Sequence, residues 1–128
     1  MSLEIDKLLI ERLFEQAKES PRLRMNYDLR TSSADTSQRM LNALLPGTEV
    51  PIHRHEETAE TVVCLCGRLE ELIYDEMPDG TFQEVSRHLL CPSEEKYGIQ
   101  IPAGAWHTIC VLEPSVIFEA KDGAFVPR

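Results

Sequence analysis

Long apolar runs and an excess of positive charge are both missing from this sequence. The longest apolar stretch, around residues 61–66, falls far short of the roughly 20 residues that a membrane-spanning helix needs. Thirteen Lys and Arg residues stand against 22 Asp and Glu residues, which gives a net charge of -9. Such a charge repels phosphate backbones and anionic lipid surfaces at long range, so we expect neither nucleic acid nor a membrane as a partner.

The start of the chain and the spacing of its cysteines exclude two further classes of protein. The first residues have neither the basic end nor the apolar run of a secretory signal, so we expect a cytoplasmic protein whose four cysteines are free thiols. Cys64 and Cys66 are separated by one residue, whereas zinc knuckles use a gap of two. This spacing favours buried packing over a metal-binding pair.

The first 20 residues predict an amphipathic helix. Ser2 can cap its start, and the proline after Ser20 should end it. Apolar residues recur every four positions, at Ile5, Leu9, Leu13 and Ala17. We expect this helix (residues 1–20) to lie on the outside of the domain or on a partner subunit. A chain of 128 residues has room for one core, so residues 21–128 are taken as a single domain.

From Thr36 onward, short β-like runs alternate with turn residues, as in a sandwich or barrel. Strands are predicted over residues 38–45, 50–55, 60–66, 68–75, 81–90, 97–101, 106–112 and 115–121. The turns between them include residues 46–47, 67, 78–80, 102–104 and 113–114, which are rich in Gly and Pro. This number of strands is typical of a jelly roll.

Two histidines and a carboxylate form the most informative segment. His53 and His55 are one residue apart, so on a strand they project from the same face, and Glu60 can return from the next strand. His107 follows the tight turn 102–104 and could bring a third imidazole to the same place. Imidazole and carboxylate together suit a divalent transition metal, with Fe, Mn, Zn, Ni and Co as candidates.

These residues resemble the motifs of the cupin superfamily. The segment Gly-x5-His53-x-His55-x4-Glu60-x6-Gly is similar to the first cupin motif, and Pro102-x-Gly104-x2-His107 to the core of the second. The resemblance implies an all-β fold, the cupin double-stranded β-helix or jelly-roll barrel, here with an N-terminal α-helix. It also implies one octahedral metal site with two positions left for water or substrate. The ligands in that site would be His53, His55, Glu60 and His107.

A narrower resemblance runs from about Ser20 to Gly123. Residues 20–26, 38–47, 53–55 and 101–109 are similar to the WbuC-type cupins found among surface-polysaccharide (O-antigen) genes. This implies a small sugar-derived or carboxylate substrate in polysaccharide biosynthesis. Lys96 and Val111 depart from the second motif, where cupins usually have a glycine and an asparagine.

Three residues are candidates for substrate contacts: Arg24, Tyr27 and Asn42. Arg24 and Tyr27 belong to a cationic, hydrogen-bonding cluster in an acidic chain. Arg24 could grip a substrate carboxylate or phosphate, or it could pair with surface acids. Asn42 shares a strand face with Gln38 and Met40, where it could contact a ligand or satisfy a strand end.

The sequence leaves three functions open. The first is an enzyme whose metal polarises a substrate oxygen, with isomerisation, epimerisation and dioxygenation all known on this fold. The second is a metal-dependent binding or sensor domain for a small molecule, without turnover. The third is a structural metal, although structural sites prefer four tetrahedral ligands rich in sulfur. No catalytic residue is assigned, because the shared face of Glu119 and Lys121 on the last strand favours an ion pair over a catalytic acid and base. A homodimer is expected, since an amphipathic helix and exposed strand edges favour burial against a twin subunit.

Overall fold

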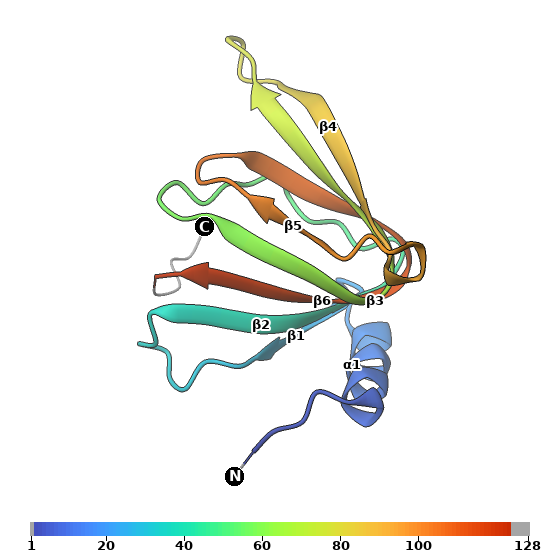
Figure 1. Ribbon diagram of the computed structural model, residues 1–128. Helices are drawn as coiled ribbons and strands as arrows, with labels where there is room; N and C mark the ends of the chain where they lie inside the picture. Colours follow the sequence, from blue (N-terminus) through green and yellow to red (C-terminus); the bar gives the residue numbers. More distant parts are fainter. Residues whose placement is uncertain (1, 124–128) are drawn as a thin grey trace.

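The computed structural model describes residues 2–123, and Figure 1 shows one helix lying beside a rolled β-sheet. Residue 1 and residues 124–128, the outer ends of the two predicted segments, lie outside the described residues. The elements are α1 (Lys7–Glu19), β1 (Arg24–Asp28), β2 (Ser37–Leu44), β3 (Glu60–Glu76), β4 (Phe82–Leu90), β5 (Gly98–Ile101) and β6 (Trp106–Asp122), with a 3-10 turn at Pro92–Glu94. Within the described part of the chain, no helix has the length and apolar character needed to cross a membrane.

Helix α1 begins later than predicted. The side chain of Asp6, and not Ser2, caps it by accepting a hydrogen bond of 3.0 Å from the Leu9 amide. Ile5 therefore lies ahead of the helix and is exposed, which corrects its place in the predicted stripe. The helix ends at Ser20, as predicted, and buries Leu9, Leu13 and Ala17 against the outer side of the barrel of its own chain (Figure 1).

Strand β2 separates the helix from the barrel interior. Side chains on a strand alternate between its two faces. Leu41 and Ala43 accordingly pack in the cluster beneath the helix, while Gln38, Met40 and Asn42 line the interior. The interior side of this wall is thus more polar than its outer side.

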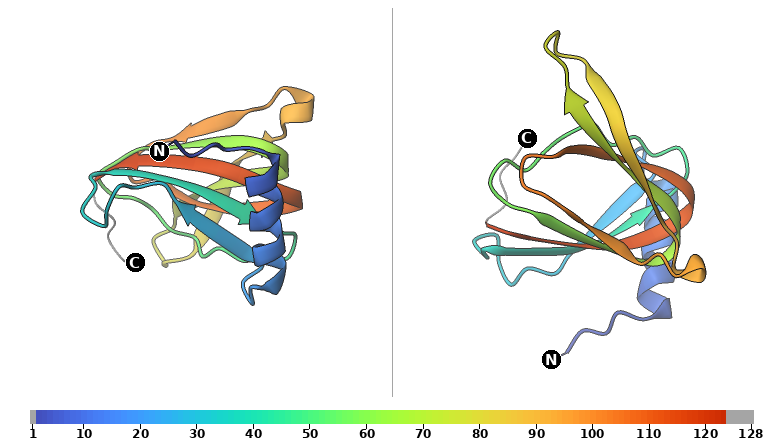
Figure 2. Two further views of the ribbon diagram at one scale, coloured as in Figure 1. Left: turned by 90° about the horizontal axis from the view of Figure 1, so that it is seen from below. Right: turned by 45° about the horizontal axis from the view of Figure 1, so that its top comes forward.

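The two longest strands, β3 and β6, run through the whole roll. The strand order is β1-β2-β6-β3-β4, with β5 also paired to β3. The first part of β3 pairs with β5 and the end of β6, whereas its second part pairs with β4 and the start of β6. Each strand therefore contributes to both halves of the barrel (Figure 2). The sequence predicted each of them as two strands, and this was wrong: the expected turns at 67 and 113–114 are bends with register shifts inside continuous strands.

Two other differences concern the segment that closes the barrel. Residues 50–55 were predicted as a strand, but within them only His53 forms a bridge, an isolated one to His107. Pro51 has no N–H to donate to a ladder. The segment is instead held by the backbone contacts of His53 and His55 and by side chains beside it. Thr108 Oγ1 donates to the Val50 carbonyl, and Arg24 Nη1 donates to the carbonyl of Glu49 (2.6 Å), just before the segment. Strand β1, which supplies Arg24, was not predicted.

The interior of the barrel has an apolar part and a polar part. Buried apolar side chains fill the first, namely Leu44, Val62, Cys64, Leu69, Leu90, Ile101, Val111 and Ile117. The polar part is a cavity of about 160 Å³. The candidate site lies in this cavity.

Candidate metal centre

Backbone pairing places His53 directly opposite His107. The His53 amide donates to the His107 carbonyl (3.0 Å), and the His107 amide donates to the His53 carbonyl (2.8 Å). Residues paired in this antiparallel manner project their side chains to the same side. The two imidazole rings accordingly lie 4.3 Å apart, measured between their centroids.

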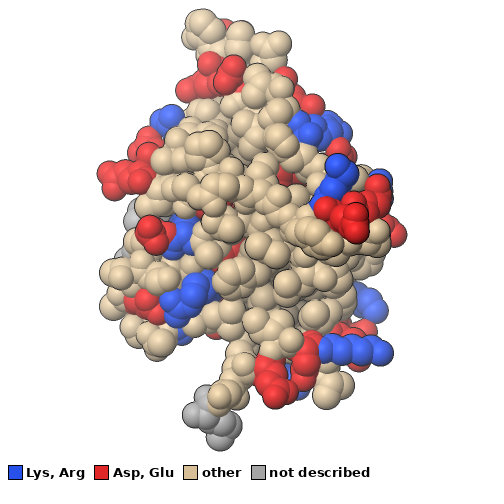
Figure 3. Space-filling view, viewed as in Figure 1, with Lys and Arg blue, Asp and Glu red and all other residues tan. Residues whose placement is uncertain are grey.

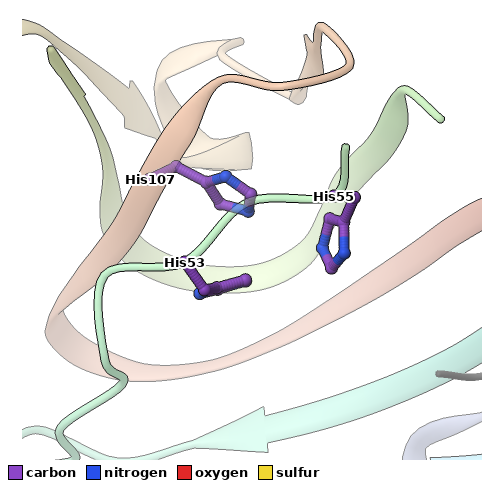
Figure 4. Close-up of side chains that lie close together, drawn as sticks. All are labelled: His53, His55 and His107. Atoms are coloured by element: carbon purple, nitrogen blue, oxygen red, sulfur yellow. The ribbon is translucent and has the colours of Figure 1, made fainter. Parts of the chain in front are cut away.

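His55 and Glu60 complete the group. The His55 carbonyl accepts a hydrogen bond of 2.8 Å from the Gly104 amide, which ties this part of the chain to the turn before His107. The ring of His55 lies 5.2 Å from that of His53 and 5.5 Å from that of His107, and Figure 4 shows the three rings converging. Glu60, the first residue of β3, lies with Oε2 3.2 Å from His55 Nε2 and Oε1 3.7 Å from His107 Nε2. The structure thus brings all four predicted ligands together.

The spacing of the three histidines suits a single metal ion. One ring nitrogen from each of His53, His55 and His107 can be chosen so that all three lie within 4.8 Å of one another. This is close to twice a metal–nitrogen bond of about 2.1 Å. A small closure of the rings would therefore bring the three nitrogens to one ion.

Hydrogen bonds fix the orientation of two of these rings. Nδ1 of His53 lies 2.9 Å from the Pro51 carbonyl, and Nδ1 of His107 lies 2.9 Å from the Ala105 carbonyl. A carbonyl only accepts, so each Nδ1 carries a hydrogen, and in the neutral form of the ring the lone pair is then on Nε2. This is the arrangement by which proteins orient histidines toward a metal.

Two buried nitrogens at the centre have no hydrogen bond among the described residues. They are Nε2 of His55 and Nε2 of His107, whose approaches to Glu60 lack hydrogen-bond geometry. A buried polar atom without a partner is costly, and a cation held between these nitrogens and the carboxylate would satisfy it. The donor set therefore fits a divalent transition metal.

The carboxyl group of Glu60 is held in its charged form. Burial raises its pKa, but the side chains of His107 and His55 act in the opposite direction and prevail, so that the pKa is lowered to about 2. At neutral pH the group is therefore an anion. A negative charge beside three imidazoles is a combination that attracts a cation.

The cavity around these residues contains two of the three predicted substrate contacts. Arg24 and Asn42 line it together with the three histidines and Glu60. Tyr27 instead packs against the apolar cluster beneath the helix, because it lies on the outer face of β1. Its neighbour Asn26 lies on the opposite face and lines the cavity. The structure thus separates Tyr27 from the group. Glu119 and Lys121, from the end of β6, also line the cavity.

Comparison with known families decides the classification. The family model described as "Domain of unknown function (DUF6016)" matches residues 5–86, well over half of the chain. The chain belongs to this family. No curated protein matches this DUF6016 member.

Solved structures show which fold the DUF6016 chain adopts. The capsular polysaccharide assembling protein CapF from Staphylococcus aureus is 18% identical, with a TM-score of 0.64 over 84% of this chain and 30% of CapF. An oxalate oxidase in complex with glycolate is 13% identical, with a TM-score of 0.63 over 83% of this chain and 54% of the oxidase. The cupin domain of Cnp3 from Schizosaccharomyces pombe is 12% identical, with a TM-score of 0.54 over 78% of this chain and 64% of that one.

These likenesses confirm the predicted cupin fold, and at such low identities they establish the fold alone. The DUF6016 chain spans less than two thirds of the length of each of the three proteins. The narrower resemblance to WbuC-type cupins stays a prediction.

Among the residues that line the cavity, sequence reasoning missed the charged residue Glu71 on β3. Its side chain is only 2% exposed, and its Oε2 has no hydrogen-bond partner among the described residues. Burial, with the nearby carboxylates of Glu60 and Glu119, raises the pKa of Glu71 well above its usual range. The signal that would have found it is the alternation of Glu71 with Leu69 and Ile73, because Leu69 lies in the core and Ile73 packs against it.

The cysteine pair lies in a different environment from the histidines. Cys64 is buried in the apolar core, as expected, and Cys66 is partly buried beneath the helix. Burial raises the pKa of Cys64 to about 11. A thiol kept neutral in this way is a poor metal ligand, because metals bind the thiolate.

Proposed function

We propose that this chain is a metal-dependent enzyme that acts on a small carboxylate or sugar-derived substrate inside the barrel. The observation that carries the proposal is the convergence of three imidazoles and an ionised carboxylate at the wall of a polar cavity. His53, His55, His107 and Glu60 would hold the metal. When bound, a divalent transition metal would polarise an oxygen of the substrate.

The remaining residues of the cavity would bind and orient the substrate. Arg24 lines the cavity and would attract an anionic group, and a planar guanidinium can fix the orientation of a carboxylate by two parallel hydrogen bonds. Asn42 would add a hydrogen bond from β2. Orientation of this kind removes much of the entropic cost of reaction.

The biological setting that we propose is the synthesis of a surface polysaccharide. The WbuC-type resemblance supports it, as does the fold shared with CapF, which is described as a capsular polysaccharide assembling protein. Isomerisation, epimerisation and dioxygenation are the candidate reactions. The identity of the metal would separate them, because redox-active iron favours oxygen chemistry and zinc favours Lewis-acid chemistry.

The proposal is tested first by the metal content of protein purified without chelator. We expect up to one divalent transition metal per chain by elemental analysis. His53→Ala and Glu60→Gln should each remove it, since each loses one ligand of the group. His88→Ala, which changes an exposed histidine of β4, serves as the control and should keep the wild-type content. Equal metal content in the wild type, His53→Ala and Glu60→Gln would reject the assigned ligands.

A further inference from the structure

Two buried oxygen atoms of the cavity lack hydrogen-bond partners among the described residues. They are Oε2 of Glu71 and Oδ1 of Asn42, and both residues line the same cavity as the three histidines. Buried polar atoms in proteins are nearly always paired, so each exception needs an explanation. An apolar residue at either position would avoid the cost of an unpaired buried atom. A hydrogen bond to a ligand would explain why polar residues stand there instead.

The strand register places Glu71 close to the candidate metal centre without making it part of that centre. Ile73 of β3 pairs with His107 of β6, and Glu71 pairs with Ile109, the next position on the same face. Glu71 is therefore the diagonal neighbour of His107, at a separation of about 7–8 Å in such pairs. Asn42 comes from β2, which pairs with the other end of β6. The two oxygens thus belong to opposite halves of the roll.

The chemistry of these atoms indicates what they would bind. An amide oxygen accepts a hydrogen bond, whereas a carboxyl group accepts one or, when protonated, donates one. The hydroxyl group of a ligand can do both, so it would satisfy either atom. The cavity also contains Arg24, whose charge suits a carboxylate. Its volume of about 160 Å³ is large enough to admit a small organic acid, since a cavity volume of about 10–15 Å³ measured in this way already holds one water.

We propose that Glu71 and Asn42 form a hydroxyl-recognition subsite, which selects small hydroxylated carboxylates over unsubstituted ones. The inference rests on the proposed function, because the carboxylate end of the ligand is assigned to the metal and Arg24. Glu71 and Asn42 form hydrogen bonds with the hydroxyl groups of the ligand, which lie away from its negatively charged carboxylate.

The test compares two acids, glycerate and propionate, which share a three-carbon carboxylate and differ in two hydroxyl groups. Calorimetry on metal-loaded wild-type protein should show glycerate binding at least tenfold more tightly than propionate. In Glu71→Met, which has a similar shape but no oxygen, the ratio should fall below about threefold, because a hydrogen bond to a buried partner has been lost. Glu71→Gln keeps an oxygen acceptor and should keep the preference.

The control is Met40→Leu, which changes an apolar residue of the same cavity wall and should leave the ratio unchanged. Metal content and circular dichroism establish that each variant is folded and loaded, and Asn42→Val takes the place of Glu71→Met if the latter does not fold.

One kind of result would count against the subsite and another against the proposed function, and the two can be distinguished. A glycerate preference that survives in Glu71→Met would assign the hydroxyl groups to the metal and overturn the subsite, as would equal wild-type affinities for the two acids. The proposed function would stand in both cases. If neither acid binds metal-loaded wild-type protein, the carboxylate substrate itself is wrong, and the subsite falls with it.

Discussion

At the scale of single residues, the candidate ligands owe their positions to different kinds of contact. His53 and His107 are placed by a pair of backbone hydrogen bonds, and their rings are oriented by the carbonyls of Pro51 and Ala105. Glu60 is placed by the start of β3. Because backbone contacts change little on substitution, replacing one imidazole should remove a ligand while leaving the others where they are.

Arg24 carries a prediction at this scale. Its Nη1 donates to the Glu49 carbonyl (2.6 Å) and to Thr48 Oγ1 (3.4 Å), so the side chain is held at the cavity in a defined position. Metal-loaded protein should bind propionate or glycerate more tightly than metal-free protein does. Arg24→Ala should weaken this binding about tenfold without loss of metal, since a charged hydrogen bond contributes about 1.5–3 kcal/mol. Calorimetry and elemental analysis measure the two effects.

Arg30→Ala is the matched control for Arg24→Ala, because Arg30 pairs with Asp28 and does not line the cavity. It should bind like the wild type. Identical affinities in metal-loaded, metal-free and Arg24→Ala protein would remove Arg24 from the site and favour a binding module for another ligand.

At the scale of elements, the decisive feature is the bend shared by β3 and β6. Gly67 has φ +98°, a backbone conformation that residues with a Cβ rarely adopt. A Cβ at this position would lie 2.3 Å from the Pro114 carbonyl oxygen and 2.3 Å from Ser115 Oγ. Glycine therefore permits the close approach of the two strands, and this approach allows each of them to serve both halves of the barrel.

Gly67→Ala should consequently destabilise the fold by about 3 kcal/mol or more, from backbone strain of about 1–3 kcal/mol plus the clash with β6. The measurement is the urea dependence of unfolding. Gly80→Ala is the control, because Gly80 has a similar φ of +84° but no described atom within 4 Å of the point where a Cβ would lie. The loss of stability in Gly80→Ala should be limited to the backbone strain. Equal losses of stability in the two variants would contradict the close packing at the bend.

At the scale of the whole molecule, the surface combines scattered charge with exposed apolar side chains. Figure 3 shows basic side chains only in small groups among acidic ones on the face that it presents. The exposed apolar residues include Leu8 on α1 and Val85 on β4, at 71% and 52% exposure. Strand β4 is also the last strand of the sheet order, so its outer edge is available for pairing.

We therefore predict a homodimer. Light scattering at micromolar concentration should give twice the chain mass of 14.6 kDa. Leu8→Glu and Val85→Glu would identify the interface, because a charge on a buried dimer surface weakens association, whereas the same change on a free surface does not. The mass of a single chain for the wild type would contradict the prediction.

The sequence by itself determined the local features of this protein. The motifs around His53 and His107 resemble those of cupins, and this resemblance implied that His53, His55, Glu60 and His107 would meet. They do, although their role as metal ligands remains a prediction. The end of α1 at Ser20 and the approximate bounds of β2 and β4 also followed from short-range patterns. These bounds depend on alternation along a strand and on the conformations that Gly and Pro allow, which neighbouring residues already encode.

Only the tertiary structure decided the features that depend on distant contacts. The continuity of β3 and β6 depends on each strand finding partners on both sides of its bend. The segment 50–55 is held by one isolated bridge and by a side chain of β6 rather than by a ladder. Glu71 alternates with the apolar residues Leu69 and Ile73, which indicates the face that it shares, but only the rolling of the sheet places it at the cavity. A two-residue alternation tells which residues share a face of a strand, but whether that face meets water or the interior is settled by what packs against it.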